Sequence, residues 1–174
     1  MVNEIKAIET RYKGYRFRSR LEARWAVFFD ALGVKWEYEK EGYQLPSGWY
    51  LPDFWLSQVK MWAEVKGNKF SCREMRLAEE LVDATGFRVL ILDGPIEPRC
   101  YWGIGKIDRD GCRDSWDYDI AEGHEYWKSE SRFYCHCGED CDIDNPNRYE
   151  DVSPLWKKAV TAARSARFEH GEQP

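Results

Sequence analysis

Asp53, Glu64 and Lys66 combine two carboxylates and an amine at a spacing that could assemble a single site. Side chains alternate faces along a strand, so Glu64 and Lys66 project the same way if residues 61–66 are extended. If residues 49–56 pair with them as a hairpin, Asp53 approaches Glu64. Two carboxylates at such a short distance repel each other unless a cation lies between them. A hard, oxygen-preferring ion such as Mg²⁺ is the natural partner.

Such a site suits the hydrolysis of a phosphate ester. A divalent ion polarises the phosphate, lowers the pKa of a bound water and neutralises charge on the leaving oxygen. Lys66 beside the acids can orient the attacking water and stabilise the charge that develops. An ordinary interpretation stays open, because Glu and Lys two apart are common on exposed strands and Pro-Asp is common in turns.

A helix that precedes these residues supplies a further carboxylate. Ser19 suits the N-cap position, and Glu22 three residues later predicts a capping box. The helix is expected to run to about Leu32 and to stop at Gly33. Its apolar positions share one face: Leu21, Trp25, Phe28, Phe29 and Leu32. At about 100° per residue Glu22 lies on the margin of that face, so its carboxylate could hold the same metal or a second one.

Alternating polarity and turn residues predict the remaining elements. Residues 12–18 alternate aromatic and basic side chains, as a short strand or an extended arm would. The other expected elements are strands at 35–39, 49–56, 61–66 and 87–92, a helix over 71–85, and a C-terminal helix from 153 to about 168. Pro52 indicates an edge or a bulge in the strand that contains it. This order predicts an α/β fold.

Taken together, the acids, the lysine and the order of elements resemble the PD-(D/E)XK nuclease superfamily. The matching segments are RSRLEARWAVFFDALGVKWEYE (18–39), YLPDFW (50–55) and WAEVKG (62–67), within residues 10–93. They are similar to small nuclease-like proteins of bacteriophages and their bacterial hosts. The resemblance implies a restriction-endonuclease-like core, with a helix, a three-stranded antiparallel meander, a second helix and a strand.

The resemblance also implies an activity, the Mg²⁺- or Mn²⁺-dependent hydrolysis of phosphodiester bonds in DNA. By position, Asp53, Glu64 and Glu22 would be the metal-binding acids and Lys66 the catalytic lysine. An endonuclease is favoured over an exonuclease, in phage or bacterial DNA processing, recombination or repair. Dimers are common in this superfamily, so a homodimer is one expected assembly. RNA cleavage stays open, as does a catalytically silent module that binds nucleic acid or a protein partner.

Charge is unevenly distributed along the chain. The net charge is -5, which argues against indiscriminate coating of nucleic acid. Residues 1–24 nevertheless carry seven bases against three acids, whereas residues 97–151 carry seven bases against fifteen acids. The basic end is a candidate phosphate-facing surface, although a solvated arm would have the same composition. The candidate nucleic-acid contacts are Arg16, Arg18, Arg20, Lys69 and Arg73.

Five of the six cysteines lie in the acidic segment 96–151 and point to a second metal site there. A reducing cytosol disfavours disulfides, and thiolates are good Zn²⁺ ligands. Structural zinc takes four ligands, and the candidates are Cys135, Cys137 and Cys141 with Cys112, Cys100 or His136. No two of them form a Cys-x2-Cys pair, and a free cysteine is often simply buried. The expected domains are a nuclease core (1–95), this segment (96–151) and a C-terminal helix with a tail (152–174).

Other classes of protein fit the chain less well. With 174 residues, 43% of them hydrophobic, it can build a core and should not be globally disordered. It has no run of about 18 apolar residues, and its polar N-terminus lacks the apolar stretch of a secretory signal. We therefore expect a cytoplasmic protein that does not enter a membrane, located in the host cytoplasm if a phage encodes it.

Overall fold

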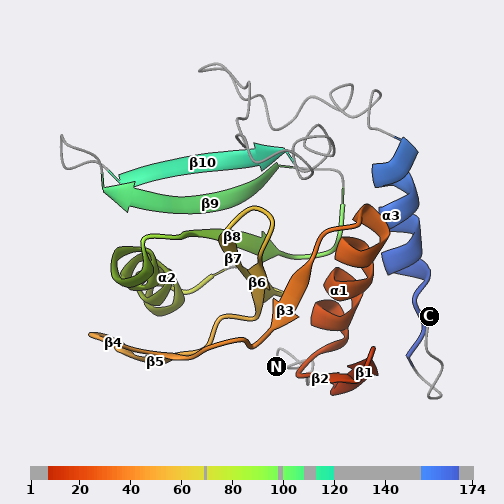
Figure 1. Cartoon of the computed structure of the whole chain (residues 1–174), viewed down its shortest axis with the longest axis horizontal. Coiled ribbons are helices and arrows are strands. Elements are labelled where there is room, and N and C mark those ends of the chain that lie inside the picture. Colours follow the sequence, from red (N-terminus) through yellow and green to blue (C-terminus); the bar gives the residue numbers. More distant parts are fainter. Residues whose placement is uncertain (1–7, 69, 98–99, 108–112, 120–153, 169–174) are drawn as a thin grey trace, which may run out of the picture.

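A six-stranded, mostly antiparallel sheet forms the centre of the molecule, with helices on both of its faces (Figure 1). The computed structural model describes residues 8–68, 70–97, 100–107, 113–119 and 154–168, and three helices lie in these ranges. The fold is therefore mixed α/β, as the sequence patterns predict. No helix in the described part of the chain is long and apolar enough to cross a membrane.

The strand order in the sheet is β10-β9-β8-β7-β6-β3. The strands are β3 (Trp36–Tyr38), β6 (Phe54–Leu56), β7 (Met61–Lys66), β8 (Arg88–Asp93), β9 (Cys100–Ile107) and β10 (Arg113–Asp119). All neighbours are antiparallel except β7 and β8, which run parallel. A parallel pair needs a long crossover, which α2 (Cys72–Thr85) supplies. The strands β3, β6 and β7 form an antiparallel meander at one side of the sheet.

The expectation of one strand over 49–56 is wrong, because two separate strands share this stretch. β5 (Gly48–Tyr50) pairs with β4 (Tyr43–Leu45) in a hairpin of its own, and β6 follows after a gap. Pro52 lies in the gap. Proline has no N–H to donate to a strand ladder and therefore interrupts the pairing. The break leaves Asp53 immediately before β6, at the end of a strand rather than within one.

The first helix, α1 (Arg20–Leu32), begins and ends where the sequence predicts. Ser19 caps it by accepting the Glu22 N–H at 3.2 Å. Gly33 ends it with a φ of 74°, a left-handed conformation that glycine adopts without strain. The expected capping box is not formed at this helix, because the Glu22 carboxylate accepts the N–H of Arg18 and not that of the cap residue.

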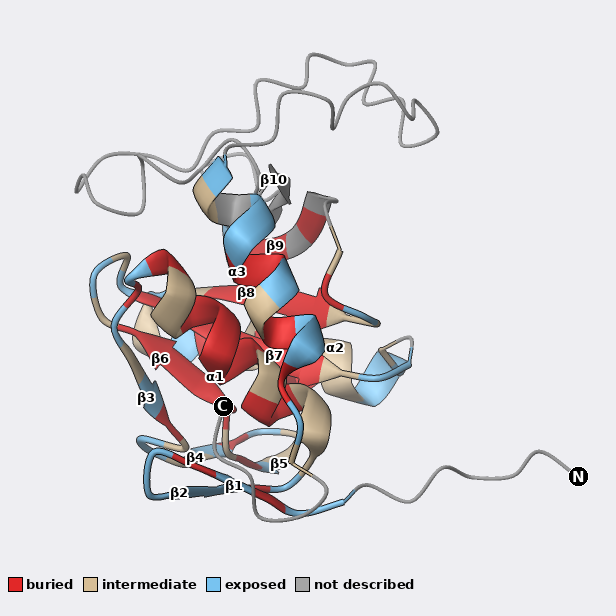
Figure 2. Ribbon diagram, turned by 90° about the vertical axis from the view of Figure 1, so that its right-hand side faces the viewer, coloured by how far each residue is buried: buried red, intermediate tan, exposed pale blue. Residues whose placement is uncertain are grey.

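Two apolar cores lie on opposite faces of the sheet, and Figure 2 shows how completely α1 and the central strands are buried. One core lies beneath α1 and includes the edge-to-face pair Trp25 and Phe28. α3 (Pro154–Ser165) closes its outer side, where the small, fully buried Ala159 and Ala163 let the two helices approach closely. The other core lies beneath α2 and the β4–β5 hairpin.

The basic N-terminal stretch forms a hairpin. β1 (Thr10–Tyr12) and β2 (Tyr15–Phe17) pair antiparallel across a turn at Lys13 and Gly14, whose φ angles of 47° and 83° are both positive. Turns of this handedness match the twist of the two strands. Phe17, fully buried, anchors the hairpin in the core beneath α1. The hairpin therefore places Arg18, the residue after β2, next to the start of α1.

The segment that starts at residue 96 begins by extending the sheet. β9 and β10 form a hairpin beside β8, so the first part of this segment is regular sheet. Four of the zinc candidates, Cys112, Cys135, Cys137 and Cys141, lie outside the described residues, as do His136 and the side chain of Cys100. The zinc site therefore stays a prediction.

Candidate active site

Three buried carboxylates gather near the end of β7. Asp53 is 5%, Glu64 4% and Glu22 7% exposed, whereas acidic side chains are rarely buried to this degree unless they have partners. Asp53 directly precedes β6, Glu64 lies on β7, and Glu22 lies in the first turn of α1. The charges of both glutamates act on Asp53. The structure thus places Asp53 and Glu64 in contact, with Glu22 near enough for its charge to act on Asp53.

Two hydrogen bonds connect the start of β6 with the end of β7, and each has a buried carboxylate as its acceptor. The Val65 N–H donates to Asp53 Oδ2 at 2.8 Å, and the Asp53 N–H donates to Glu64 Oε2 at 3.4 Å. The register explains this arrangement, because Phe54 lies opposite Ala63 and the residues beyond them are therefore neighbours. Each carboxylate is held by the backbone of the other strand.

Glu22 accepts hydrogen bonds from three donors. Its Oε2 accepts the Tyr38 hydroxyl at 2.6 Å and the Arg18 N–H at 3.1 Å, and its Oε1 accepts the Ser19 hydroxyl at 2.6 Å. Such donors offset much of the free energy lost when a carboxylate leaves water. Glu22 is therefore fixed by the helix cap and by β3. Sequence reasoning missed Tyr38, because its contact with α1 depends on how β3 packs.

Lys66 lies between two carboxylates. Its Nζ is 3.2 Å from Glu64 Oε1 and 3.1 Å from Glu74 Oε1. As strand geometry predicts, Glu64 and Lys66 share a face, while Val65 points into the core beneath α1. Burial lowers the pKa of Lys66, but the neighbouring carboxylates outweigh burial and raise it above its usual value. The amine is therefore protonated at neutral pH.

Glu74 was not among the predicted site residues. It lies in the first turn of α2, where it forms a capping box with Ser71. The Ser71 N–H and hydroxyl donate to Glu74 Oε2 at 2.8 and 2.7 Å, and its other oxygen contacts Lys66. The Ser-x-x-Glu spacing is typical of such a cap, but nothing in that spacing points to the lysine. The cap of α2 therefore also positions Lys66.

The buried acids destabilise one another. Burial, followed by the charges of Glu64 and Glu22, holds the pKa of Asp53 well above its usual range. Burial also raises the pKa of Glu64, although Lys66 opposes this shift. Tyr50 is affected in the same way, since burial and then the charge of Glu64 raise the pKa of its hydroxyl. The site thus concentrates negative charge, a condition that a bound cation would relieve.

Arg18 is the predicted nucleic-acid contact that belongs to this site. Its guanidinium pairs with Glu39, and one of its Nη atoms is 3.7 Å from Asp53 Oδ1. The side chain of Arg18 is 56% exposed, whereas that of Asp53 is 7% exposed. Arg18 therefore stands at the rim of the site, between solvent and the buried acid.

The other predicted nucleic-acid contacts lie further out. Arg16 is exposed and pairs with Glu9. Arg20 opens α1, and Arg73 reaches from the first turn of α2 towards the turn between β4 and β5. Lys69 lies outside the described residues. These residues remain predicted contacts, because their positions alone do not assign them a ligand.

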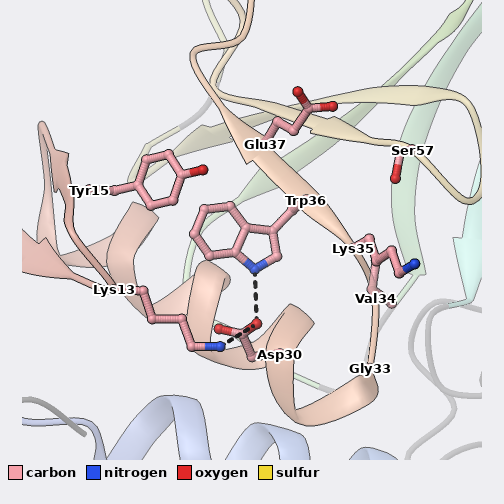
Figure 3. Close-up of a pocket in the computed structure, with 9 residues that line it drawn as sticks. All are labelled: Lys13, Tyr15, Asp30, Gly33, Val34, Lys35, Trp36, Glu37 and Ser57. Atoms are coloured by element: carbon pink, nitrogen blue, oxygen red, sulfur yellow. Dashed lines mark hydrogen bonds and ion pairs between the residues drawn. The ribbon is translucent and has the colours of Figure 1, made fainter.

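A hollow of about 600 Å³ opens at the other end of α1 (Figure 3). Within it, Asp30 Oδ1 accepts the Trp36 indole N–H at 3.3 Å and pairs with Lys13 Nζ at 3.0 Å. These contacts fasten the turn of the β1–β2 hairpin to α1 and β3. About 12 Å of helix separates Asp30 from Glu22, so the hollow lies apart from the three buried acids.

The donor atoms of the site fit a hard divalent cation. They are carboxylate oxygens, the ligands that Mg²⁺ prefers. The described residues contain no group of three or more His, Cys, Asp or Glu side chains already arranged to hold a metal. Asp53 and Glu64 could hold such an ion with water as its remaining ligands, which is the usual coordination of Mg²⁺ in proteins.

Comparisons with protein-family models, with curated proteins and with solved structures found no match to this chain. Two adjacent buried carboxylates suit a divalent cation, a protonated lysine beside one of them suits an anionic reaction centre, and an arginine at the rim suits a phosphate.

Proposed function

We propose that the chain is a divalent-metal-dependent nuclease that hydrolyses phosphodiester bonds of DNA, built on a restriction-endonuclease-like core. The observation that carries the proposal is the group formed by Asp53, Glu64 and Lys66. Its two acidic residues are each at most 5% exposed, and the lysine amine lies 3.2 Å from the carboxylate of the second. The same residues carry the resemblance to the PD-(D/E)XK motif. The order of α1, the β3–β6–β7 meander, α2 and β8 supports this assignment.

Asp53 and Glu64 would hold Mg²⁺ or Mn²⁺, with Glu22 adding negative charge beside them. When bound, such an ion supplies Lewis-acid polarisation of the phosphate and a lowered pKa for water. Burial and then the repulsion of Glu64 and Glu22 raise the pKa of Asp53, and this repulsion favours binding because a cation would relieve it. The hydrogen bonds that fix both carboxylates mean that little rearrangement would precede binding.

Lys66 would act on the attacking water and on the charge of the transition state. Its Nζ is protonated and is held by Glu64 and Glu74, so it donates hydrogen bonds. A donor in this position can orient a water molecule by donating a hydrogen bond to a lone pair of the water oxygen. It can also stabilise the negative charge that grows on the phosphate oxygens as the new bond forms. Lys66 would therefore serve as an electrostatic group, and the attacking water would pass its proton to solvent water.

The direct test is the digestion of single-stranded, duplex and branched DNA, and of RNA, in Mg²⁺ and in Mn²⁺. We expect metal-dependent cleavage of DNA that falls about a hundredfold or more in Lys66→Ala and is lost in Asp53→Ala and Glu64→Ala. Lys158→Ala, on the exposed side of α3, is the control and should cleave like the wild type. Unimpaired cleavage by the three site variants would refute the assignment.

The same experiment separates the proposed nuclease from its alternatives. Preferential cutting of RNA would change the substrate while keeping the chemistry. Binding of DNA without cleavage in either metal would favour a silent module. A calorimetric titration with Mn²⁺ would then show whether Asp53 and Glu64 hold a cation at all, because replacing either should abolish the binding.

A further inference from the structure

Arg18 connects the N-terminal hairpin, the first helix and the buried acids. It follows β2 directly and precedes the cap of α1. Its backbone N–H donates to Glu22 Oε2 and to the Tyr38 hydroxyl, each at 3.1 Å. Its guanidinium pairs with Glu39 and lies 3.7 Å from Asp53 Oδ1. The main chain of Arg18 is thus bonded to one buried acid, while its side chain faces another.

Arg18 is the cation that contacts Asp53 at the rim of the site, while the charge of Lys66 acts on Asp53 from the other side of Glu64. Lys66, the other cation of the site, is in direct contact with Glu64 and Glu74. The approach of Arg18 to Asp53 at 3.7 Å is longer than a hydrogen bond, so the contact is electrostatic and has no fixed geometry. A contact of this kind between a half-exposed arginine and an acid is weak and is readily exchanged for another.

The guanidinium of Arg18 is also open to a ligand from solvent. A guanidinium has five N–H donors in a planar fork that matches the oxygens of a phosphate. More than half of the side chain is exposed. Its backbone, by contrast, is anchored by the buried Phe17 on one side and the cap residue Ser19 on the other. The backbone of Arg18 is therefore fixed, and a turn of the side chain would exchange its contacts with Glu39 and Asp53 for others.

We propose that Arg18 is an exchangeable counter-cation, which neutralises Asp53 while no divalent cation is bound and turns to a phosphate oxygen of the nucleic acid once a divalent cation takes its place. This inference rests on the proposed function, because it needs a metal at Asp53 and a phosphate in front of it. It adds a coupling between the two ligands. The metal releases the arginine that the phosphate needs, and the phosphate withdraws the cation that competes with the metal.

The coupling predicts opposite effects of Arg18→Gln on the two ligands. Mn²⁺ should bind the DNA-free variant about fivefold more tightly than the wild type, because its competitor at Asp53 is gone. Duplex DNA should bind about tenfold more weakly in the presence of Ca²⁺, a hard cation with the same preference for oxygen ligands. In EDTA the loss of DNA affinity should be much smaller, since the arginine of the wild type is then engaged with Asp53.

Calorimetry with Mn²⁺ and fluorescence polarisation with a labelled duplex measure the two affinities in the full chain. Arg11→Gln is the matched control, because Arg11 is an exposed arginine on β1 of the same hairpin. Its metal affinity should equal that of the wild type. Arg18→Lys keeps the charge without the fork, so it should retain wild-type metal affinity and intermediate DNA affinity.

The outcomes distinguish a failure of the counter-cation inference from a failure of the proposed nuclease activity. If the wild type binds Mn²⁺ and cleaves DNA but Arg18→Gln shows unchanged or weaker metal binding, the counter-cation inference is overturned and the nuclease stands. Equal losses of DNA affinity in EDTA and in Ca²⁺ would overturn it in the same way. If the wild type binds no metal, the proposed function fails and the inference falls with it. Thermal unfolding of each variant checks the fold, which the backbone hydrogen bonds of Arg18 should preserve.

Discussion

Replacing Asp53 by asparagine should make the metal-free protein more stable, although the same change should abolish cleavage. The side chain is buried, and burial together with the charges of Glu64 and Glu22 raises its pKa. An amide has nearly the same shape and can still accept the Val65 N–H, but it carries no charge. Asp53→Asn therefore keeps the packing and removes the repulsion.

The size of the effect follows from the contacts of the carboxylate. The charged hydrogen bond from Val65 contributes about 1.5–3 kcal/mol. The contact with Arg18 contributes at most about 1 kcal/mol, because that arginine is half exposed. The loss of hydration opposes them by several kcal/mol, and two like charges add to it. A net gain of about 1–2 kcal/mol for the variant would raise the Tm of a domain of this length by about 2–8 °C.

The pH dependence of this gain has a definite sign. A carboxyl whose folded-state pKa lies above its unfolded value of about 3.9 binds its proton more tightly in the folded protein. The free energy of unfolding of the wild type therefore rises as pH falls through the raised pKa of Asp53. The variant lacks this contribution. The difference in stability between the two proteins should close as pH falls from above the raised pKa towards the unfolded value of about 3.9.

The assay is thermal and urea denaturation of both proteins in EDTA, repeated with Mg²⁺. Added Mg²⁺ should stabilise the wild type more than Asp53→Asn. Asp30→Asn is the matched control, since Asp30 accepts the Trp36 N–H and pairs with Lys13, so this variant should lose stability. A variant at Asp53 that unfolds more easily than the wild type in EDTA would refute the reasoning, because the charge would then be stabilising the fold.

Two further substitutions test the supports of the site. Glu74→Gln removes one of the anions that raise the pKa of Lys66, so cleavage should slow about tenfold and the alkaline limb of the pH–rate profile should move to lower pH; an unchanged profile would contradict the positioning role. Glu80→Ala removes the acceptor of the Ser47 N–H and hydroxyl, at 2.9 and 2.6 Å, and should destabilise the β4–β5 hairpin by about 1–2 kcal/mol. Amide exchange in residues 43–50 should become faster, and unchanged protection there would mean that packing alone holds the hairpin.

The arrangement of Asp53, Glu64 and Lys66 could be predicted because it depends on local geometry. Strand alternation alone places Glu64 and Lys66 on one face, and the pairing of neighbouring strands brings Asp53 beside them. The same reasoning failed for residues 49–56. Pro52 divides them into two strands. The first, β5, pairs with β4, and the sequence of β4 has no strong polar–apolar alternation that would predict a strand.

Arg18 and Glu74 reach the site through tertiary packing, which sequence patterns do not specify. The contact of Arg18 with Asp53 requires the β1–β2 hairpin to lie on α1 and β3, a position that Asp30 secures from the far end of the helix. The contact of Glu74 with Lys66 requires α2 to start close to the end of β7. The sequence near each residue indicates only a local role: Arg18 is a basic residue next to the cap of α1, and Glu74 is part of a capping box. Neither pattern predicts the contact of Arg18 with Asp53 or of Glu74 with Lys66.

The core beneath α1, the helix that carries Glu22, is completed by α3, which is synthesised much later. α1 and α3 lie side by side in Figure 1, yet 121 residues (33–153) separate them in the chain. At synthesis rates of about 5–20 residues per second, α1 would be made roughly 6 to 24 s before α3 begins. Until then the apolar surface that Ala159 and Ala163 cover is exposed to solvent or to chaperones. A nascent chain that has not reached α3 should therefore hold the acids in an incomplete core and leave DNA uncut.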